Sequence, residues 1–266
     1  LVCSIGAVIC YMLCYHMTTE RVKVEQNTQK FSFKELISEI AHNKALIGII
    51  VCALLFLLAQ LSLSNMNNYI YPNYFGNVSA MSLANLAGMV VILVLSTFIV
   101  KLSAKVGKKE LSVIGSIISA AAFLILFFIH TDNVWVWIVL VLISSVGTAM
   151  FNMVIWAMIT DVIDDSEVRT GVRQDGTIYS VYSFARKLGQ ACSSGISGVL
   201  LSIIGYTAAT AHDPKVVDGI YNVTCLVPAL GMILLFLALQ FLYPLNKKRV
   251  EENAKILKER REAKVQ

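Results

Sequence analysis

Residues 133–160 read NVWVWIVLVLISSVGTAMFNMVIWAMIT, and no Asp, Glu, Lys or Arg occurs among them. A helix that crosses a bilayer needs about 20 consecutive apolar residues. Because lipid offers no partner to backbone polar groups, a run of this length is expected to form a membrane-spanning helix. Comparable uncharged runs occupy residues 45–100, 111–131, 188–212 and 219–246.

The composition of the whole chain predicts an all-α, polytopic membrane protein. Hydrophobic residues make up 57% of the 266 and charged residues only 15%, whereas a soluble domain carries about 25% charged residues. Complete spans are expected near residues 45–66, 80–101, 110–130, 134–159, 176–206 and 219–244. Residues 1–17 are also apolar but lack the features of a signal peptide, so we interpret them as the end of a truncated span and the chain as a fragment.

The distribution of Lys and Arg predicts the orientation of these spans. Basic residues gather in segments 18–44, 101–109 and 169–173 and after residue 246, whereas Lys215 alone falls on the other side. The positive-inside rule then places the basic side, including the tail 246–266, in the cytoplasm. Because the net charge of +5 follows from this topology, we do not expect a nucleic-acid partner. SFKE at 32–35 predicts a capped surface helix within segment 18–44.

Cysteine and histidine give no sign of a metal centre or an active site. The six Cys all fall in apolar spans, where this residue usually acts as a small hydrophobe. No His–Asp or Cys–His arrangement is evident among the four His, although an intramembrane lipid enzyme would need a nucleophile with a base or metal ligands. We therefore predict that the chain is not an enzyme and binds no metal.

The fifth complete span carries a stripe of polar residues. Tyr179, Ser183, Lys187, Gln190 and Ser194 recur at spacings of four, four, three and four, which places them on one face of a helix. If this helix begins with Asp175 as its N-cap, Lys187 lies about 18 Å along it, near the middle of the bilayer. Ionisable groups at that depth are functional by default. The stripe either lines a water-filled cavity that binds a polar solute, or Lys187 pairs with a buried carboxylate that holds helices together.

Other spans carry polar residues that could complete such a cavity. Tyr182 and Arg186 flank the stripe, and Ser194 and Gly198 suit close helix packing. Trp156 either lines the cavity or belongs to an interfacial belt. The remaining candidates are Ser145, Thr148 and Asn152 at helical spacing, with Gln60 and Asn65 in reach and Tyr69, Tyr71 and Tyr74 as an outer aromatic belt.

The stretch DVIDDSEVRTGVRQDGTIYSVYSFARKLGQA at 161–191 resembles the signature of the glycoside–pentoside–hexuronide:cation symporters of the major facilitator superfamily. The likeness is carried by Asp161, Asp164, Glu167, Thr170, Gly171, Arg173, Gly176, Tyr179, Ser180 and Lys187. Asp165 and Ser166 replace the Tyr-Gly that is usual in this family. The basic loop KLSAKVGKK at 101–109 is also similar to a loop found in each half of these transporters.

The resemblance implies twelve helices in two halves around a central cavity. Residues 1–17 would then be the end of helix six, 18–44 the middle loop, 45–245 helices seven to twelve and 246–266 a basic tail. In a member of that family, the positions that match Asn152, Tyr182, Ser183 and Lys187 lie at or near the sugar and cation sites. With the polar stripe, the predicted substrate-binding residues are Lys187, Ser183, Tyr182, Tyr179, Asn152, Trp156 and Gln190.

The resemblance also implies cation-coupled symport of a sugar or glycoside by alternating access in the cytoplasmic (inner) membrane. The coupling ion, Na⁺ or H⁺, would be bound mainly by the absent N-terminal half, since no Asp or Glu lies inside the predicted spans. Transport of another amphiphilic solute such as a lysolipid, and a truncated product without transport, stay open as alternatives.

Charged residues concentrate between residues 159 and 190, at the predicted cytoplasmic mouth. Ion pairs that form in one conformation and open in another can bias the equilibrium between the two. We predict a cytoplasmic gate made of Asp161, Asp164, Glu167, Arg169 and Arg173, in which the acidic residues, with Asp165, pair with these Arg or with bases of the other half. The competing interpretation is a solvated turn.

Overall fold

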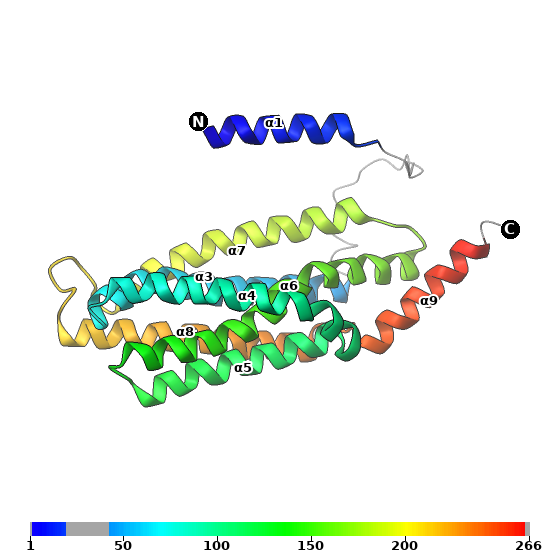
Figure 1. Ribbon diagram of the computed structural model, residues 1–266. Coiled ribbons are helices and arrows are strands. Elements are labelled where there is room, and N and C mark those ends of the chain that lie inside the picture. The colour runs from blue at the N-terminus through cyan, green and yellow to red at the C-terminus, as the bar shows by residue number, and fades with distance from the viewer. Residues whose placement is uncertain (1, 20–42, 264–266) are drawn as a thin grey trace. The chain divides into compact units, whose positions relative to one another are not determined.

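The computed structural model describes residues 2–19 and 43–263. The chain divides into two units, residues 1–38 and 39–266. The described part of the first unit is a helix, α1 (Val2–Met17), shown in dark blue in Figure 1. The surface helix predicted from residue 32 onwards falls outside the described residues.

The second unit is a bundle of long helices (Figure 1). In chain order they are α3 (Lys44–Tyr69), extended by a turn of π-helix, η1 (Ile70–Tyr74), then α4 (Val78–Val106), α5 (Lys108–Ile129), α6 (Val134–Thr170), α7 (Asp175–Ile203), α8 (Pro214–Phe241) and α9 (Lys247–Ala263). No strand occurs in segments 2–19 and 43–263. The prediction of an all-α membrane protein with several spans is confirmed, because five of these helices, α3 with η1, α4, α5, α6 and α8, are long and apolar enough to cross a membrane. Helix α7 is as long as α4, at 29 residues, but is more polar.

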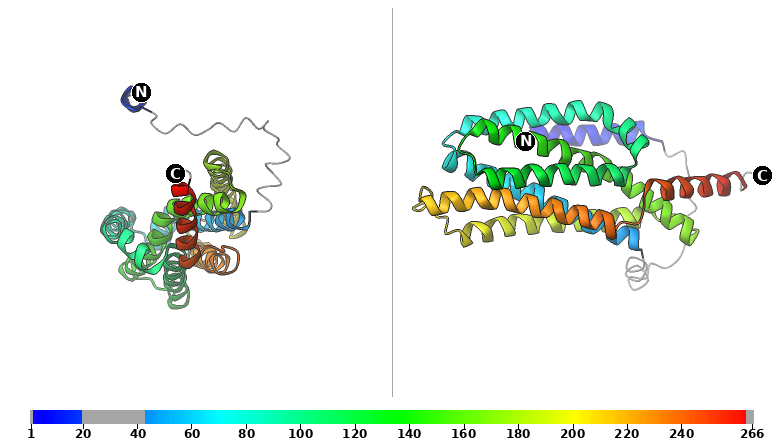
Figure 2. Two further views of the ribbon diagram at one scale, coloured as in Figure 1. Left: turned by 90° about the vertical axis from the view of Figure 1, so that its right-hand side faces the viewer. Right: turned by 90° about the horizontal axis from the view of Figure 1, so that it is seen from below.

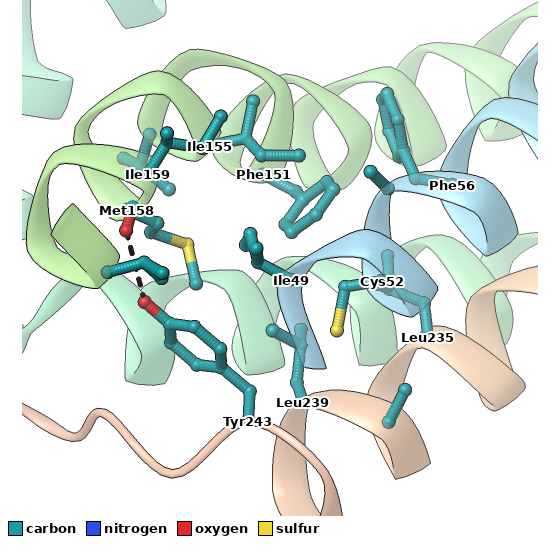
Figure 3. Packing of buried hydrophobic residues seen from close by; sticks show 14 of the residues in the cluster. Ile49, Cys52, Phe56, Phe151, Ile155, Met158, Ile159, Leu235, Leu239 and Tyr243 are labelled. Atoms are coloured by element: carbon teal, nitrogen blue, oxygen red, sulfur yellow. Dashed lines mark hydrogen bonds between the residues drawn. The ribbon is translucent and has the colours of Figure 1, made fainter. Parts of the chain in front are cut away.

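The helices pack side by side along the length of the bundle (Figure 2). Helix α3 packs on α7 and α8, α5 packs on α6 and α8, and α4 packs mainly on α6. Figure 3 shows the apolar core between them, where Phe56 of α3 meets Phe151 of α6 at a ring-centroid distance of 5.0 Å. The buried Tyr243, which follows α8, donates a hydrogen bond to the Met158 carbonyl at 3.3 Å.

Helices α5 and α6 approach each other most closely at two glycines. A Cβ added to Gly115 would lie 2.5 Å from the Gly147 carbonyl oxygen, so only glycine fits there. One turn further along, the Ser119 hydroxyl donates to the Ser144 carbonyl at 2.7 Å across the same interface. Small residues let helix backbones approach closely in membranes, and the crossing follows this rule.

Helix α7 packs on α3 through a line of small residues other than the predicted one. Gly189 faces Leu54, whose Cδ2 would lie 2.8 Å from an added Cβ, and the next small residues on this line, Ser193 and Ser197, are buried. Asn65 of α3 donates to the Ser197 hydroxyl at 3.1 Å. Ser194 and Gly198, which the sequence predicts to suit close helix packing, do not take part in this contact, and both are exposed.

The basic segments of this unit meet at one end of the bundle, which we call the basic end: residues 101–109, 161–175 and 244–263. Helix α6 continues eleven residues past its predicted limit because 160–170 stay helical, and Gly171 at φ 77° ends it. Helix α7 begins at Asp175, but that residue is not its N-cap. Gln174 holds the cap position, and the Asp175 carboxylate accepts from Arg173 Nε at 2.8 Å instead.

The opposite end of the bundle carries the aromatic residues predicted to form an interfacial belt. Tyr74 donates to the Asp132 carboxylate at 2.9 Å and is partly exposed, and the Tyr69 ring contacts Tyr206 at 4.9 Å. Tyr71 differs from this expectation because its side chain is 1% exposed. It turns inward in the π-helical turn, where Pro72 cannot donate a backbone hydrogen bond.

Candidate functional site: a polar cavity and an adjacent cationic wall

A cavity of about 230 Å³ opens between α3, α4 and α6. Its wall combines apolar residues, including Phe56 and Tyr71, with polar side chains from all three helices. The polar members are Gln60, Ser64 and Asn67 of α3, Asn85 of α4, and Ser145, Thr148 and Asn152 of α6. The helical spacing predicted for the α6 residues therefore places all three in the same cavity wall.

Amide groups in this wall are free to bind a ligand. The side chains of Gln60, Asn67, Asn85 and Asn152 make no hydrogen bond to any residue in the described parts of the chain. The Asn67 Oδ1 atom is fully buried and still lacks a partner. A buried polar atom without a partner is costly, and amides both donate and accept. The wall therefore matches a solute with several hydroxyl groups.

Beyond Asn152, the face of α6 continues into a cluster of aromatic and cationic residues. Trp156 lies one turn further along α6, and its ring contacts Tyr179 and Tyr182 of α7 at 6.1 and 5.9 Å. The Arg186 guanidinium lies 4.9 Å from the Trp156 ring centroid and donates to the Tyr182 hydroxyl at 3.1 Å. We call Trp156, Tyr179, Tyr182 and Arg186 the cationic wall.

The polar stripe predicted for α7 lies on a face of this helix other than the one that packs on α3. Lys187 is exposed, and its Nζ donates to Gln190 Oε1 at 3.2 Å. Ser183 is half-buried, and its side chain makes no hydrogen bond to other described residues. The structure thus brings Trp156, Tyr179 and Tyr182 together and pairs Lys187 with Gln190, whereas Ser183 bonds to neither group.

At the basic end, most of the predicted gate residues form ion pairs. Arg173 bonds to Asp164 at 2.9 Å and to Glu167 at 2.8 Å. Burial opposes its charge, but these hydrogen bonds, with that to Asp175, raise the pKa of the guanidinium above its ordinary value. Arg173 therefore stays charged in the folded protein and links the end of α6 to the start of α7.

Two acidic residues have partners that the sequence did not indicate. Asp161, whose side chain is 7% exposed, pairs with Lys108 at the start of α5 at 2.6 Å. Asp165 accepts from Arg249 Nε and Asn253 Nδ2 of α9, each at 3.0 Å. Arg169 lies beside this group, around a cavity of about 230 Å³ at the start of α3. The charged stretch is thus an ordered helix end and not a solvated turn.

Sequence reasoning missed three features of the site. Asn67 and Asn85 were not singled out, although an amide inside an apolar span is itself a signal. Arg186 was identified only as a neighbour of the polar stripe, because its contact with Trp156 joins two helices. The partners of Asp161 and Asp165 come from α5 and α9, and no local pattern in the sequence pairs segments so far apart.

Comparison with known proteins shows to which family of proteins the chain is related. A family model described as "MFS/sugar transport protein" matches residues 1–247. The chain is 31% identical over 237 residues to the "Uncharacterized symporter YjmB" of Bacillus subtilis, covering 89% of this chain and 51% of that protein. It is 30% identical over 259 residues to the "Glucuronide carrier protein homolog" of Escherichia coli, covering 95% of this chain and 55% of that protein.

The "Putative sulfoquinovose importer" of Escherichia coli is 28% identical over 249 residues, covering 92% of this chain and 53% of that protein. The chain thus spans about half the length of the curated relatives it matches. The family match covers nearly the whole chain and agrees with the symporter signature at 161–191. The chain belongs to the sugar-transport family of the major facilitator superfamily, in its glycoside–pentoside–hexuronide type.

Proposed function

We propose that this chain forms one half of a secondary active transporter that moves a sugar or glycoside by alternating access. The observation that carries the proposal is the cavity between α3, α4 and α6, with four amide side chains that have no partner in residues 43–263. Sugar hydroxyls both donate and accept hydrogen bonds. Amides without a partner can bond to these hydroxyls, and no hydrogen bond within the helix bundle has to be broken.

A second half is part of the proposal. The cavity volume of about 230 Å³ is smaller than the roughly 300–1,000 Å³ of most small-molecule pockets, which fits a site that another bundle completes. The curated relatives are about twice as long as this chain. The coupling ion, Na⁺ or H⁺, would bind mainly to that second half, since the described helices hold Asp and Glu only near their ends.

The protein would lie in the cytoplasmic (inner) membrane of the cell. By the positive-inside rule, its basic end would face the cytoplasm. There the Asp164–Arg173–Glu167 group would act as a gate that favours one of the two access states. Neutralising Arg173 should then shift the ratio of inward- to outward-facing protein. Reaction rates of single cysteines placed at both mouths measure this ratio, and equal rates before and after the change would rule the gate out.

The transport proposal is tested by uptake of labelled glycosides into proteoliposomes that contain the full-length protein, with and without a Na⁺ or proton gradient. Asn67→Ala and Asn85→Ala should each lower uptake about tenfold at low solute concentration, because the cavity loses a hydrogen bond to the solute. Asn68→Ala is the matched control, since Asn68 is exposed and bonds within α3.

Uptake that equals that of the control in both cavity variants would contradict the proposed binding site. Uptake of lysolipid but of no glycoside would contradict the solute class. Absence of any uptake by the unaltered protein under every gradient would contradict the transport proposal itself.

A further inference from the structure

The cavity beside the start of α3, which we call the basic cavity, is separate from the polar cavity between α3, α4 and α6. It has a volume of about 230 Å³ and lies between the start of α3, the end of α6 and the link from α8 to α9. Its wall contains the cations Lys44, Arg169 and Arg249. Asp165 is the single acidic residue among the described residues of this wall. Positive charge is therefore in excess around the cavity.

The one carboxylate of the wall already has a partner. Asp165 is buried, and its Oδ1 atom accepts from Nε and Nη2 of Arg249, each at 3.0 Å. The Arg249 side chain is nevertheless 49% exposed. Lys44 is also exposed and forms no ion pair with the described residues. The basic cavity thus presents cationic groups that Asp165 does not balance.

The position of Lys44 at the start of a helix adds to this positive potential. Lys44 is the first residue of α3, and the first turn of this helix has no acidic residue. The N-terminus of a helix carries a partial positive charge and attracts anions, so a cation there is unfavourable unless an anion is bound nearby. The uncharged run 45–100 begins directly after Lys44, which places the cavity at the membrane surface.

An apolar surface lies next to the basic cavity. Ile47 is exposed and stands three residues after Lys44, on the same face of α3. The end of α8 contributes the exposed side chains of Phe241 and Leu242. The two helices touch here, because a Cβ added to Gly48 would lie 2.7 Å from the Leu242 carbonyl oxygen. A ligand with an anionic head and an apolar body would match both surfaces.

We propose that the basic cavity binds the phosphate group of an anionic membrane phospholipid. Ammonium and guanidinium groups both bind phosphate oxygens, and basic pockets between helices at the cytoplasmic side of a membrane suit the heads of such lipids. The acyl chains would lie along Ile47, Phe241 and Leu242. A bound lipid would join the start of α3 to the end of α6, whichever solute the protein carries.

The experiment measures lipid binding by the purified full-length protein in a neutral detergent. Phosphatidylglycerol, phosphatidylcholine and inorganic phosphate are added separately, and native mass spectrometry and thermal unfolding report on binding. Phosphatidylglycerol should stay bound and raise the Tm, whereas the other two should have little effect at the same concentration. Lys44→Glu should weaken phosphatidylglycerol binding about tenfold or more, because it reverses one charge of the cavity wall.

Lys44→Glu should still fold, since an acidic residue is favourable in the first turn of a helix. Lys248→Glu is the matched control: it reverses a charge in the first turn of α9, outside the cavity wall, on a side chain that is 85% exposed. Equal affinity of Lys44→Glu and Lys248→Glu for phosphatidylglycerol overturns the inference. An equal effect of inorganic phosphate shows a site for free phosphate and overturns the lipid assignment, and an equal effect of phosphatidylcholine overturns the selection by charge.

Discussion

The bundle contains two groups of positive charges that differ in what surrounds them. At the basic end, Lys108, Arg173 and Arg249 each contact at least one carboxylate of the same chain. In the cationic wall, Arg186 contacts rings and a hydroxyl. The first group neutralises itself, whereas the second keeps its charge available.

The difference separates charges that hold helices together from a charge that contacts no carboxylate in residues 43–263. A buried pair that loses one member leaves an uncompensated charge, so its removal costs stability. A cation that lies on aromatic faces contributes little to stability, so its presence at membrane depth needs another cause. Stability measurements on single variants therefore distinguish the two groups directly.

The largest loss of stability is expected for Asp161→Ala. The carboxylate is buried, and its removal leaves Lys108 without its counter-charge at the α5–α6 contact. We expect the free energy of unfolding to fall by about 3 kcal/mol, measured on purified protein in detergent by thermal and denaturant unfolding. The double variant Lys108→Ala with Asp161→Ala should recover part of this loss. Additive losses would mean that the pair does not interact.

A loss of about 2 kcal/mol is expected for Asp165→Ala, because Arg249 and Asn253 both lose their acceptor. Helix α9 should also detach from α6, so trypsin should cleave within residues 247–263 faster than in the unaltered protein. Glu259→Ala is the control, since Glu259 is exposed and, among the described residues, pairs only with Lys255. Unchanged cleavage would show that α9 is held by other contacts.

Arg173→Gln should cost about 1 kcal/mol or less, although three carboxylates are lost as partners. The side chain is 33% exposed, and exposed ion pairs are weak. Salt screens such pairs, so raising the salt concentration should destabilise the unaltered protein more than the variant. An equal response of both proteins to salt would contradict this assignment.

The smallest effect on stability is expected for Arg186→Gln, at less than about 1 kcal/mol, because two cation–π contacts and one hydrogen bond, but no ion pair, are removed. The same unfolding measurement applies. A decrease in stability as large as that of Asp161→Ala would place Arg186 among the charges that hold helices together. The distinction between the two groups would then be wrong.

The class of fold could be predicted from uncharged runs alone, because lipid permits few other structures for residues 133–160. The helical spacing of Ser145, Thr148 and Asn152 likewise placed them together in one wall. Helix limits were less accurate, since the mostly polar residues 160–170 continue α6 once they have partners on α5, on α9 and at Arg173 in the loop before α7. The packing line of α7 at Gly189 was missed because the face of α7 that is buried depends on where α3 lies.

The long-range ion pairs could not be predicted, since they join segments more than 50 residues apart. Asp161 and Lys108 are separated by 53 positions and Asp165 and Arg249 by 84. The local pairs were predictable, as Arg173 is only nine and six residues from Asp164 and Glu167.

Helix α6 is one unbroken rod of 37 residues, about 55 Å long. It carries Asn152 of the cavity wall, the Trp156 ring and the acidic residues of the basic end. From Asn152 to its end at Thr170 is about 27 Å, so a tilt of roughly 10° at the cavity would displace that end by nearly 5 Å. That displacement exceeds the length of any ion pair at the end of the rod. If α6 tilts as one body when a solute binds at Asn152, the pairs of Asp161 with Lys108 and of Asp165 with Arg249 would open in the same movement.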